Sequence, residues 1–249
     1  MHGRFGSGVR TVPGPAGESD SESRPAAGRP FEAPARRVAL ALSRLGATAD
    51  GLSLASVVPA IACAVAAALG HFYLAAGLLL VAGLCDLLDG ALARASGRST
   101  EFGALLDSTV DRIADAAPLL GLIAYFADNR WAALCPALAL LGGFMVSYVR
   151  ARAEGLAIAL PPLWMRRTER LVITGTALVL SDIKIPDVAL GAPVTLGLVL
   201  LLAVLSFAAA GHALLAARRL LDNAAAARTV IRVDAPPALQ RAQHQSRQP

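Results

Sequence analysis

The sequence predicts an all-α integral membrane protein, and two observations predict it: the composition and the length of the apolar runs. Of the 249 residues, 55% are hydrophobic and only 16% are charged, whereas soluble domains carry about a quarter of charged residues. The mean hydropathy is +0.56. Runs rich in Ala, Leu and Val, such as Leu52–Leu69 and Val194–Ala210, are about as long as a helix that crosses a bilayer. A single soluble core could not hide this much apolar surface from water.

The cysteines and the net charge exclude other classes. Cys63, Cys85 and Cys135 all lie in apolar runs, so they indicate neither a disulfide framework nor a zinc site. The net charge of +5 would suit nucleic acid, but the arginines cluster beside apolar segments. We therefore expect membrane lipids and phosphorylated substrates as partners, and no nucleic acid.

The two ends of the chain differ from its middle. Residues 1–35 are rich in Gly, Pro, Ser and Arg, which predicts a disordered tail without a signal peptide. Arginines and apolar residues then alternate at helical spacing up to Leu45, which predicts an amphipathic helix lying on the lipid headgroups. Residues 36–220 form the membrane domain. The tail of residues 221–249 is polar, and we expect it to be poorly ordered from Asp222 onward.

Six membrane-spanning helices are expected within the membrane domain. Their ranges are 51–70, 72–96, 103–126, 131–153, 168–182 and 190–216. Arginines gather at one side of these spans, whereas the opposite side offers only His71, Arg130 and Lys184. The positive-inside rule therefore predicts a multi-pass protein of the cytoplasmic membrane, with both termini and the busy loops in the cytoplasm.

Four aspartates lie at the facing ends of the second and third spans. Asp86 and Asp89 are three residues apart and Asp107 and Asp111 are four apart, so each pair occupies one helical face. A short loop joins the two helices, which lets the faces meet. Carboxylates inside a membrane are costly and typical of functional sites. Because hard anionic oxygens select Mg²⁺ or Mn²⁺, we predict one or two such ions here. The structural alternative is that these aspartates pair with neighbouring arginines.

The residues between the two aspartate pairs suit a nucleotide diphosphate. Gly90 lets a ligand approach the helix closely, and Ala93 keeps the next turn shallow. Arg94 offers a fork of donors to a phosphate. Thr100 precedes the third span, where its hydroxyl can cap the helix or bind a phosphate.

This segment follows the pattern D-x2-D-G-x2-A-R-x8-G-x3-D-x3-D from Asp86 to Asp111. At every specified position this pattern matches the signature of the CDP-alcohol phosphotransferases, which the sequence therefore resembles. The resemblance covers about residues 36–220. Members of that family are six-span membrane enzymes, usually homodimers. They exchange the CMP of a CDP-linked lipid or alcohol for an acceptor alcohol.

The resemblance implies a role for each matching residue. Asp86, Asp89 and Asp107 are implied as ligands of the divalent metal. Asp111 is implied both as a metal neighbour and as the catalytic base that deprotonates the acceptor hydroxyl. The residues implied to bind the CDP-lipid are Asp50, Gly51, Leu52, Ser53, Gly90, Arg94 and Thr100.

Within that family, three stretches look like those of bacterial phosphatidylinositol phosphate synthases: Thr48–Ser53, Asp107–Arg112, and Ser147–Glu154 followed by Thr168–Leu171. The residues that this likeness implies for binding the phosphate of the acceptor are Arg150, Arg152 and Arg170. Those enzymes also place a basic residue on the last span, for which the nearest candidates here are His212, Arg218 and Arg219.

The implied activity is therefore transfer of the phosphatidyl group of CDP-diacylglycerol to an inositol phosphate, with release of CMP, in phospholipid biosynthesis. Two alternatives stay open. The acceptor substrate could be glycerol 3-phosphate, which would make the protein a phosphatidylglycerophosphate synthase. The protein could also be a non-catalytic carrier of divalent cations or solutes. Asp115 lies one turn beyond Asp111, and we expect it to pair with Arg112 or another basic residue outside the site.

Overall fold

All regular structure in the described part of the chain is helical. The computed structural model describes residues 37–39, 41, 43, 44, 46–96, 100–182 and 191–233, with only the backbone of residues 225–233. The long helices are α2 (Ala49–Ala68), α3 (Phe72–Ser96), α4 (Glu101–Tyr125), α5 (Arg130–Gly155), α6 (Arg167–Ser181) and α7 (Gly191–Val233). The expected N-terminal tail of residues 1–35 lies outside the described residues.

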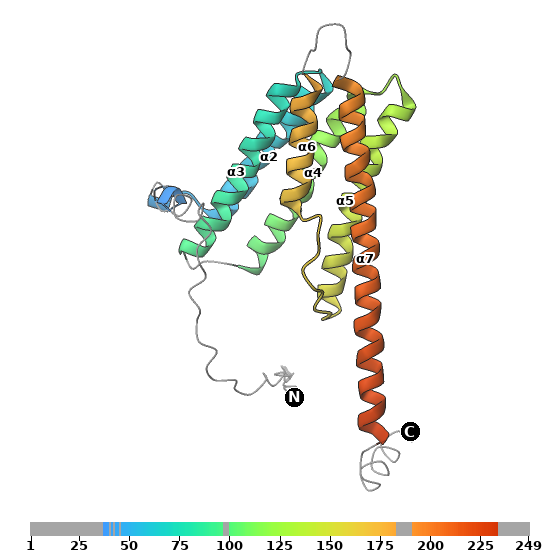
Figure 1. Ribbon diagram of the computed structural model, residues 1–249. Coiled ribbons are helices and arrows are strands. Elements are labelled where there is room, and N and C mark those ends of the chain that lie inside the picture. Colours follow the sequence, from blue (N-terminus) through green and yellow to red (C-terminus); the bar gives the residue numbers. More distant parts are fainter. Residues whose placement is uncertain are drawn as a thin grey trace, which may run out of the picture.

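The six long helices coincide with the six predicted spans to within a few residues, except at the end of the last one. Helix α7 continues to Val233 instead of ending near residue 216, so the predicted end of the last helix is wrong and the tail expected from Asp222 begins as helix. The physical reason is the alanine-rich run after Arg219, because Ala has the highest helix propensity. In Figure 1 this helix runs well past the ends of the others.

Four of the helices are long and apolar enough to cross a membrane: α2, α3, α5 and the part of α7 up to Ala224. Helix α4 has a suitable length of 25 residues, but it contains three aspartates, a glutamate and an arginine. Helix α6 has only 15 residues, fewer than the roughly 20 that an apolar span needs. In Figure 1 these two helices lie among the others.

The bundle has small residues inside and large apolar residues outside. On α2, the buried face consists of Ser53, Ser56, Ala60, Cys63, Ala66 and Ala67. Its opposite face exposes a stripe of Leu54, Val58, Ile61 and Val65. Small residues at helix contacts with large aliphatic residues outside are typical of packing in lipid, where water provides no drive to bury leucine.

Close helix crossings hold the site-bearing helices together. Gly121 of α4 lies so near the backbone of Ala64 on α2 that a side chain there would collide with it. Gly142 of α5 meets α7 in the same way, since an added Cβ would lie 2.9 Å from the Cβ of Ser206. Helix α2 thus packs on both α3 and α4, and α5 packs on α7.

Part of the expected amphipathic helix is described. Arg37–Ala39, Ala41, Ser43 and Arg44 are helical. Ala39 is fully buried, in a small cluster with Ala91 and Leu92 of α3. The start of the chain's helical part is therefore anchored to the end of α3 that also carries the aspartates.

Candidate active site

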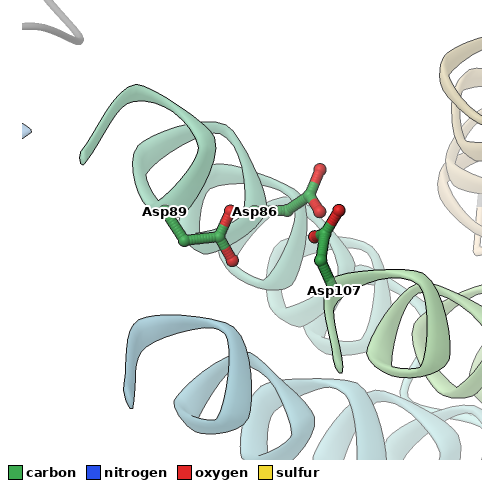
Figure 2. Close-up of side chains that lie close together, drawn as sticks. All are labelled: Asp86, Asp89 and Asp107. Atoms are coloured by element: carbon green, nitrogen blue, oxygen red, sulfur yellow. The ribbon is translucent and has the colours of Figure 1, made fainter. Parts of the chain in front are cut away.

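Three of the four predicted aspartates form a compact cluster. Asp86 and Asp89 extend from α3 and Asp107 from α4, and one carboxylate oxygen of each lies within 4.8 Å of the other two. Figure 2 shows Asp86 and Asp107 turned toward each other across the two helices, with Asp89 beside Asp86. The spacing on α3 and the packing of both helices on α2 bring these carboxylates together.

Helix α2 supplies a hydrogen bond to this cluster. The Ser53 hydroxyl donates to Oδ2 of Asp89 over 2.6 Å, and both side chains are buried. Ser53 was predicted to bind the CDP-lipid, and in the structure it also orients one of the predicted metal ligands. Carboxylates that hold metals are usually oriented by such a second hydrogen bond.

The donor set fits a divalent cation. Three carboxylates that share one small volume repel each other unless a cation lies among them. All-oxygen, anionic ligands are those that Mg²⁺ and Mn²⁺ prefer. In addition, Oδ1 of Asp111 is buried without a hydrogen-bond partner among the described residues. Asp86, Asp89 and Asp107 are thus the residues that share one small volume for the metal, and Asp111, the fourth predicted metal residue, lies next to Asp86 because Nη1 of Arg167 contacts both.

Asp111 is held instead by an arginine that the sequence analysis did not select. Nη1 of Arg167, at the start of α6, lies 2.8 Å from Oδ1 of Asp111, an ionic contact without hydrogen-bond geometry. The same nitrogen forms an ion pair with Oδ2 of Asp86. Nε of Arg167 donates to Oδ1 of Asp115 over 3.3 Å. Arg167 therefore joins the metal cluster to the rest of α4.

Asp115 pairs with a basic residue, as expected, but it belongs to the site. Nη2 of Arg170 donates to its Oδ2 over 2.5 Å. Nη1 of Arg170 donates to the Met165 carbonyl oxygen over 3.0 Å, and the arginine is only 8% exposed. Asp115 thus fixes both arginines of α6 beside the acidic helices.

A polar cavity of about 300 Å³ adjoins the aspartate cluster on the side of α2. Its lining comprises Ala49, Asp50, Ser53, Asp89, Gly90, Ala93, Arg94, Thr100, Gly103, Ala104 and Asp107. Five of the seven residues predicted to bind the CDP-lipid are in this set. Gly51 and Leu52 are not in it, although they lie in the same first turns of α2.

The beginnings of two helices face this cavity. The Thr48 hydroxyl caps α2 by accepting a hydrogen bond from the Gly51 N–H, and Thr100 caps α4 through the Gly103 N–H. Helix N-termini carry partial positive charge and unpaired N–H groups, which favour an anion such as a phosphate. The role of Thr100 here is the capping role that the sequence allowed.

Two glycines give the cavity its width. The Arg94 guanidinium folds back over Gly90, so that an added Cβ at Gly90 would lie 3.3 Å from its Nη1. At Gly103 an added Cβ would lie 2.9 Å from Oδ1 of Asp50. Both glycines of the signature thus allow these side chains to lie close against the helix backbone beside the cavity.

A second polar cavity, of about 150 Å³, lies on the other side of Asp111. Its lining comprises Asp111, Arg112, Asp115, Val146, Ser147, Arg150, Trp164, Met165, Arg166, Arg167 and Arg170. The predicted acceptor residues Arg150 and Arg170 are in this set. Arg152 is not, because two residues further along α5 its exposed side chain points elsewhere.

The α5–α6 loop brings further arginines to this cavity. Arg166 is the N-cap of α6, and its backbone N–H donates to Oε2 of Glu169 over 2.7 Å. Met165, with φ of 58°, turns the chain just before it. Arg150 and Arg166 also line an open cavity of about 410 Å³ at this loop, so they border both cavities.

The last helix does not contribute the basic residue expected from it. His212 is exposed, and neither it nor Arg219 lines the second cavity. Arg218 is exposed and lies 3.7 Å from Asp222. The neighbouring Ala213 is fully buried in a cluster with Val149 and Leu163. Arg166 and Arg167, at the start of α6, line the second cavity.

The spacing of the arginines could have indicated their common role. Arg167 and Arg170 are three residues apart and Asp111 and Asp115 are four apart, so each pair lies on one helical face. Opposite charges on two such faces predict a pairing of the helices. What the sequence did not contain is which arginine reaches the metal cluster.

A helical bundle that holds an acidic cluster between two polar cavities defines a candidate metal-dependent membrane enzyme. Residues 46–231 match the family model described as CDP-alcohol phosphatidyltransferase. The chain therefore belongs to the CDP-alcohol phosphatidyltransferase family, as the signature implied. With four apolar helices of spanning length, it is a multi-pass membrane protein.

Curated relatives include two archaeal proteins named archaetidylinositol phosphate synthase. That of Methanothermobacter thermautotrophicus is 41% identical over 52% of this chain and 65% of its own length. That of Pyrococcus horikoshii is 37% identical over 66% of this chain and 85% of its own length. The chain thus spans just under two thirds of the first relative and most of the second.

Solved structures of a bacterial enzyme have the same fold. Mycobacterium tuberculosis phosphatidylinositol phosphate synthase with CDP-DAG bound matches with a TM-score of 0.67 and 32% identity, covering 74% of this chain and 92% of that chain. The same enzyme in complex with manganese and citrate matches with a TM-score of 0.67 and 32% identity, over 74% and 88%.

Proposed function

We propose that this protein transfers the phosphatidyl group of CDP-diacylglycerol to an inositol phosphate, releasing CMP and forming phosphatidylinositol phosphate. The observation that carries this proposal is the pair of polar cavities that flank the aspartates. Asp89 and Asp107 line the first cavity, and Asp111 lines the second. Two substrates can therefore lie on either side of the acidic residues and react directly.

The named relatives support both substrates. The mycobacterial enzyme was crystallised with CDP-DAG, and its name specifies phosphatidylinositol phosphate as the product. The archaeal relatives are named for the same headgroup on a different lipid. The five arginines around the second cavity suit a phosphorylated acceptor, because arginine binds phosphate with two parallel hydrogen bonds.

The first cavity supplies the residues for the donor substrate. Arg94 and the beginnings of α2 and α4 would bind the diphosphate. Asp86, Asp89 and Asp107 would hold the divalent metal, Mg²⁺ or Mn²⁺, which when bound neutralises charge that develops on the diphosphate. The crystal structure of the mycobacterial enzyme with manganese supports this metal class.

The second cavity supplies the residues for the acceptor. Arg150 and the arginines of α6 would hold its phosphate and so direct one ring hydroxyl toward Asp111. Asp111 would accept the hydroxyl proton while the oxygen attacks the phosphorus that carries the diacylglycerol. The bond to the CMP oxygen then breaks, and CMP leaves with the electron pair.

We further propose a topology of six spans, with the amphipathic N-terminal segment and the site on the cytoplasmic side of the cytoplasmic membrane. The arginine distribution supports this orientation. The short α6 and the charged α4 would be shielded from lipid by the four apolar helices. A homodimer is proposed because the resemblance to the family implies it.

The function is tested by CMP release from CDP-diacylglycerol, using the full-length protein in detergent with Mg²⁺ and Asp111→Asn as the blank. Inositol 1-phosphate and glycerol 3-phosphate are offered separately. Release with inositol 1-phosphate alone is expected. Release with glycerol 3-phosphate alone would retain the reaction and reject the acceptor, and absence of both release and CDP-lipid binding would favour a carrier. The same assay with Mn²⁺ in place of Mg²⁺ compares the two metals.

A further inference from the structure

Arg167 contacts more of the acidic site than any other cation in the described residues. Its Nη1 lies against Asp86, a member of the metal cluster, and 2.8 Å from Asp111, the proposed base. Its Nε donates to Asp115 over 3.3 Å. The side chain is only 18% exposed, so these contacts are little screened by water.

The same side chain lines the cavity proposed for the acceptor. Two groups of anions can therefore compete for one guanidinium: the carboxylates of Asp86 and Asp111, and a phosphate in the second cavity. While Nη1 of Arg167 is bound to Oδ2 of Asp86, the negative charge of this carboxylate oxygen is partly balanced by the arginine. Asp86 is then a weaker ligand for a metal, because a cation beside a carboxylate repels a second one.

The contact between α4 and α6 does not depend on Arg167 alone. Its Nη1 contacts Asp86 and Asp111 and its Nε contacts Asp115, and because the guanidinium is one rigid plane these contacts are made or lost together. Asp115 is also held by Arg170 over 2.5 Å, independently of Arg167. Movement of the Arg167 guanidinium toward the second cavity thus releases Asp86 and Asp111 and leaves α4 and α6 joined through Arg170.

We propose that Arg167 is a positioning residue that couples acceptor binding to metal binding, by holding Asp86 and Asp111 until the acceptor's phosphate draws its guanidinium away. This inference rests on the proposed function. Release of Asp86 strengthens the metal site, and release of Asp111 exposes the base. Because coupling between two ligands is reciprocal, the phosphorylated acceptor must tighten metal binding to the same degree that the metal tightens acceptor binding.

The test measures Mn²⁺ affinity from the electron paramagnetic resonance signal of the free ion, using the purified full-length protein in detergent. The variant is Arg167→Gln, which removes the competing cation and leaves Asp115 paired with Arg170. The matched control is Arg152→Gln. It removes the same charge from an exposed side chain of α5 that lies outside both cavities and forms no ion pair among the described residues. Each protein is titrated with and without inositol 1-phosphate, against a protein-free blank for direct chelation.

Arg167→Gln is expected to bind Mn²⁺ about tenfold more tightly than the wild type without acceptor, since it loses a charged competitor for Asp86. Arg152→Gln is expected to change the affinity by no more than about twofold, because exposed charges are well screened. Inositol 1-phosphate should tighten Mn²⁺ binding in the wild type and in Arg152→Gln, but not in Arg167→Gln. Should Arg167→Gln not fold, Arg167→Lys keeps the charge without the fork, and it should lose most of this coupling.

Unchanged or weaker Mn²⁺ binding in Arg167→Gln would overturn the inference, and so would equal coupling in all three proteins. Absence of Mn²⁺ binding to the wild type would instead reject the metal site of the proposed function. The two failures are therefore distinguishable.

Discussion

The two cavities of the site are built differently. The first is enclosed by three consecutive helices, α2 to α4, and all but the α2 part of its lining comes from one signature of 26 residues, Asp86 to Asp111. The second is assembled from α4, α5, the α5–α6 loop and α6, and it carries five arginines against two aspartates. In the described part of the chain the first cavity has three aspartates and one arginine in its lining, whereas the second is strongly basic.

This difference indicates which part of the chemistry each cavity determines. Helix beginnings, small residues and carboxylates suit a diphosphate and its metal, which every reaction of this family shares. A basic cavity on separate elements can change its arginines without disturbing the metal cluster. We therefore expect the first cavity to set the reaction and the second to set the acceptor.

Replacement of Asp111, which borders the second cavity beside the metal cluster, should have the largest effect. Asp111→Asn is expected to reduce turnover by at least about a hundredfold, because the amide cannot accept the acceptor's proton. The size of the side chain is unchanged, so elution from gel filtration should match the wild type. CMP release measures the effect, and turnover within a few-fold of the wild type would remove Asp111 from the role of base.

Arg94→Gln tests whether the first cavity binds the donor substrate and not the acceptor. Among the residues that the structure describes, Arg94 is the only arginine in the lining of the first cavity. Its loss should raise the KM for CDP-diacylglycerol by about tenfold or more, as expected for a charged hydrogen bond to phosphate. The KM for inositol 1-phosphate should stay near the wild-type value. An equal rise of both KM values would mean that the two cavities do not bind separate substrates.

Arg150→Gln makes the reciprocal test from the acceptor side. Arg150 lines the second cavity and forms no ion pair among the described residues, so its removal leaves no carboxylate unpaired. We expect the acceptor KM to rise about tenfold and the CDP-lipid KM to stay constant. Arg152→Gln is the matched control, two residues further on α5 and outside the cavity. If Arg152→Gln raised the acceptor KM as much as Arg150→Gln, the position of the cavity would be wrong.

Ser53→Ala should have the smallest effect of the four. It removes the 2.6 Å hydrogen bond to Asp89 without adding a larger side chain. Metal affinity should fall by roughly fivefold, which corresponds to about 1 kcal/mol for one hydrogen bond. The Mg²⁺ concentration that gives half-maximal CMP release measures this, while the acceptor KM at saturating Mg²⁺ should be unchanged. A shift confined to the acceptor KM would contradict the assignment of Ser53 to the metal side.

The sequence predicted the first cavity better than the second for a physical reason. Fixed spacing on two adjacent helices determines which faces meet, so the cluster of Asp86, Asp89 and Asp107 could be inferred directly. The second cavity depends on where a loop places the start of α6, and spacing does not contain that information. Arg167 was missed for this reason, and Arg152 was included although it lies outside.

The helices show the same limit. Their number and most boundaries followed from the apolar runs, since each run has to form a helix to satisfy its backbone in lipid. The end of α7 did not, because the apolar run stops before Asp222 and the helix continues through Asp222, Asn223 and the alanines of 224–227. The high helix propensity of alanine explains this continuation, which an apolar run does not mark.

The central claim is that donor and acceptor lie in the two cavities at the same time and react directly across the aspartates. The most direct test is exchange of radiolabelled CMP into CDP-diacylglycerol, measured with Mg²⁺ in the absence of any acceptor. Direct transfer predicts no exchange without acceptor, and exchange only when phosphatidylinositol phosphate is supplied. Exchange by the protein and the CDP-lipid alone would show a phosphatidyl-enzyme intermediate and would contradict the account.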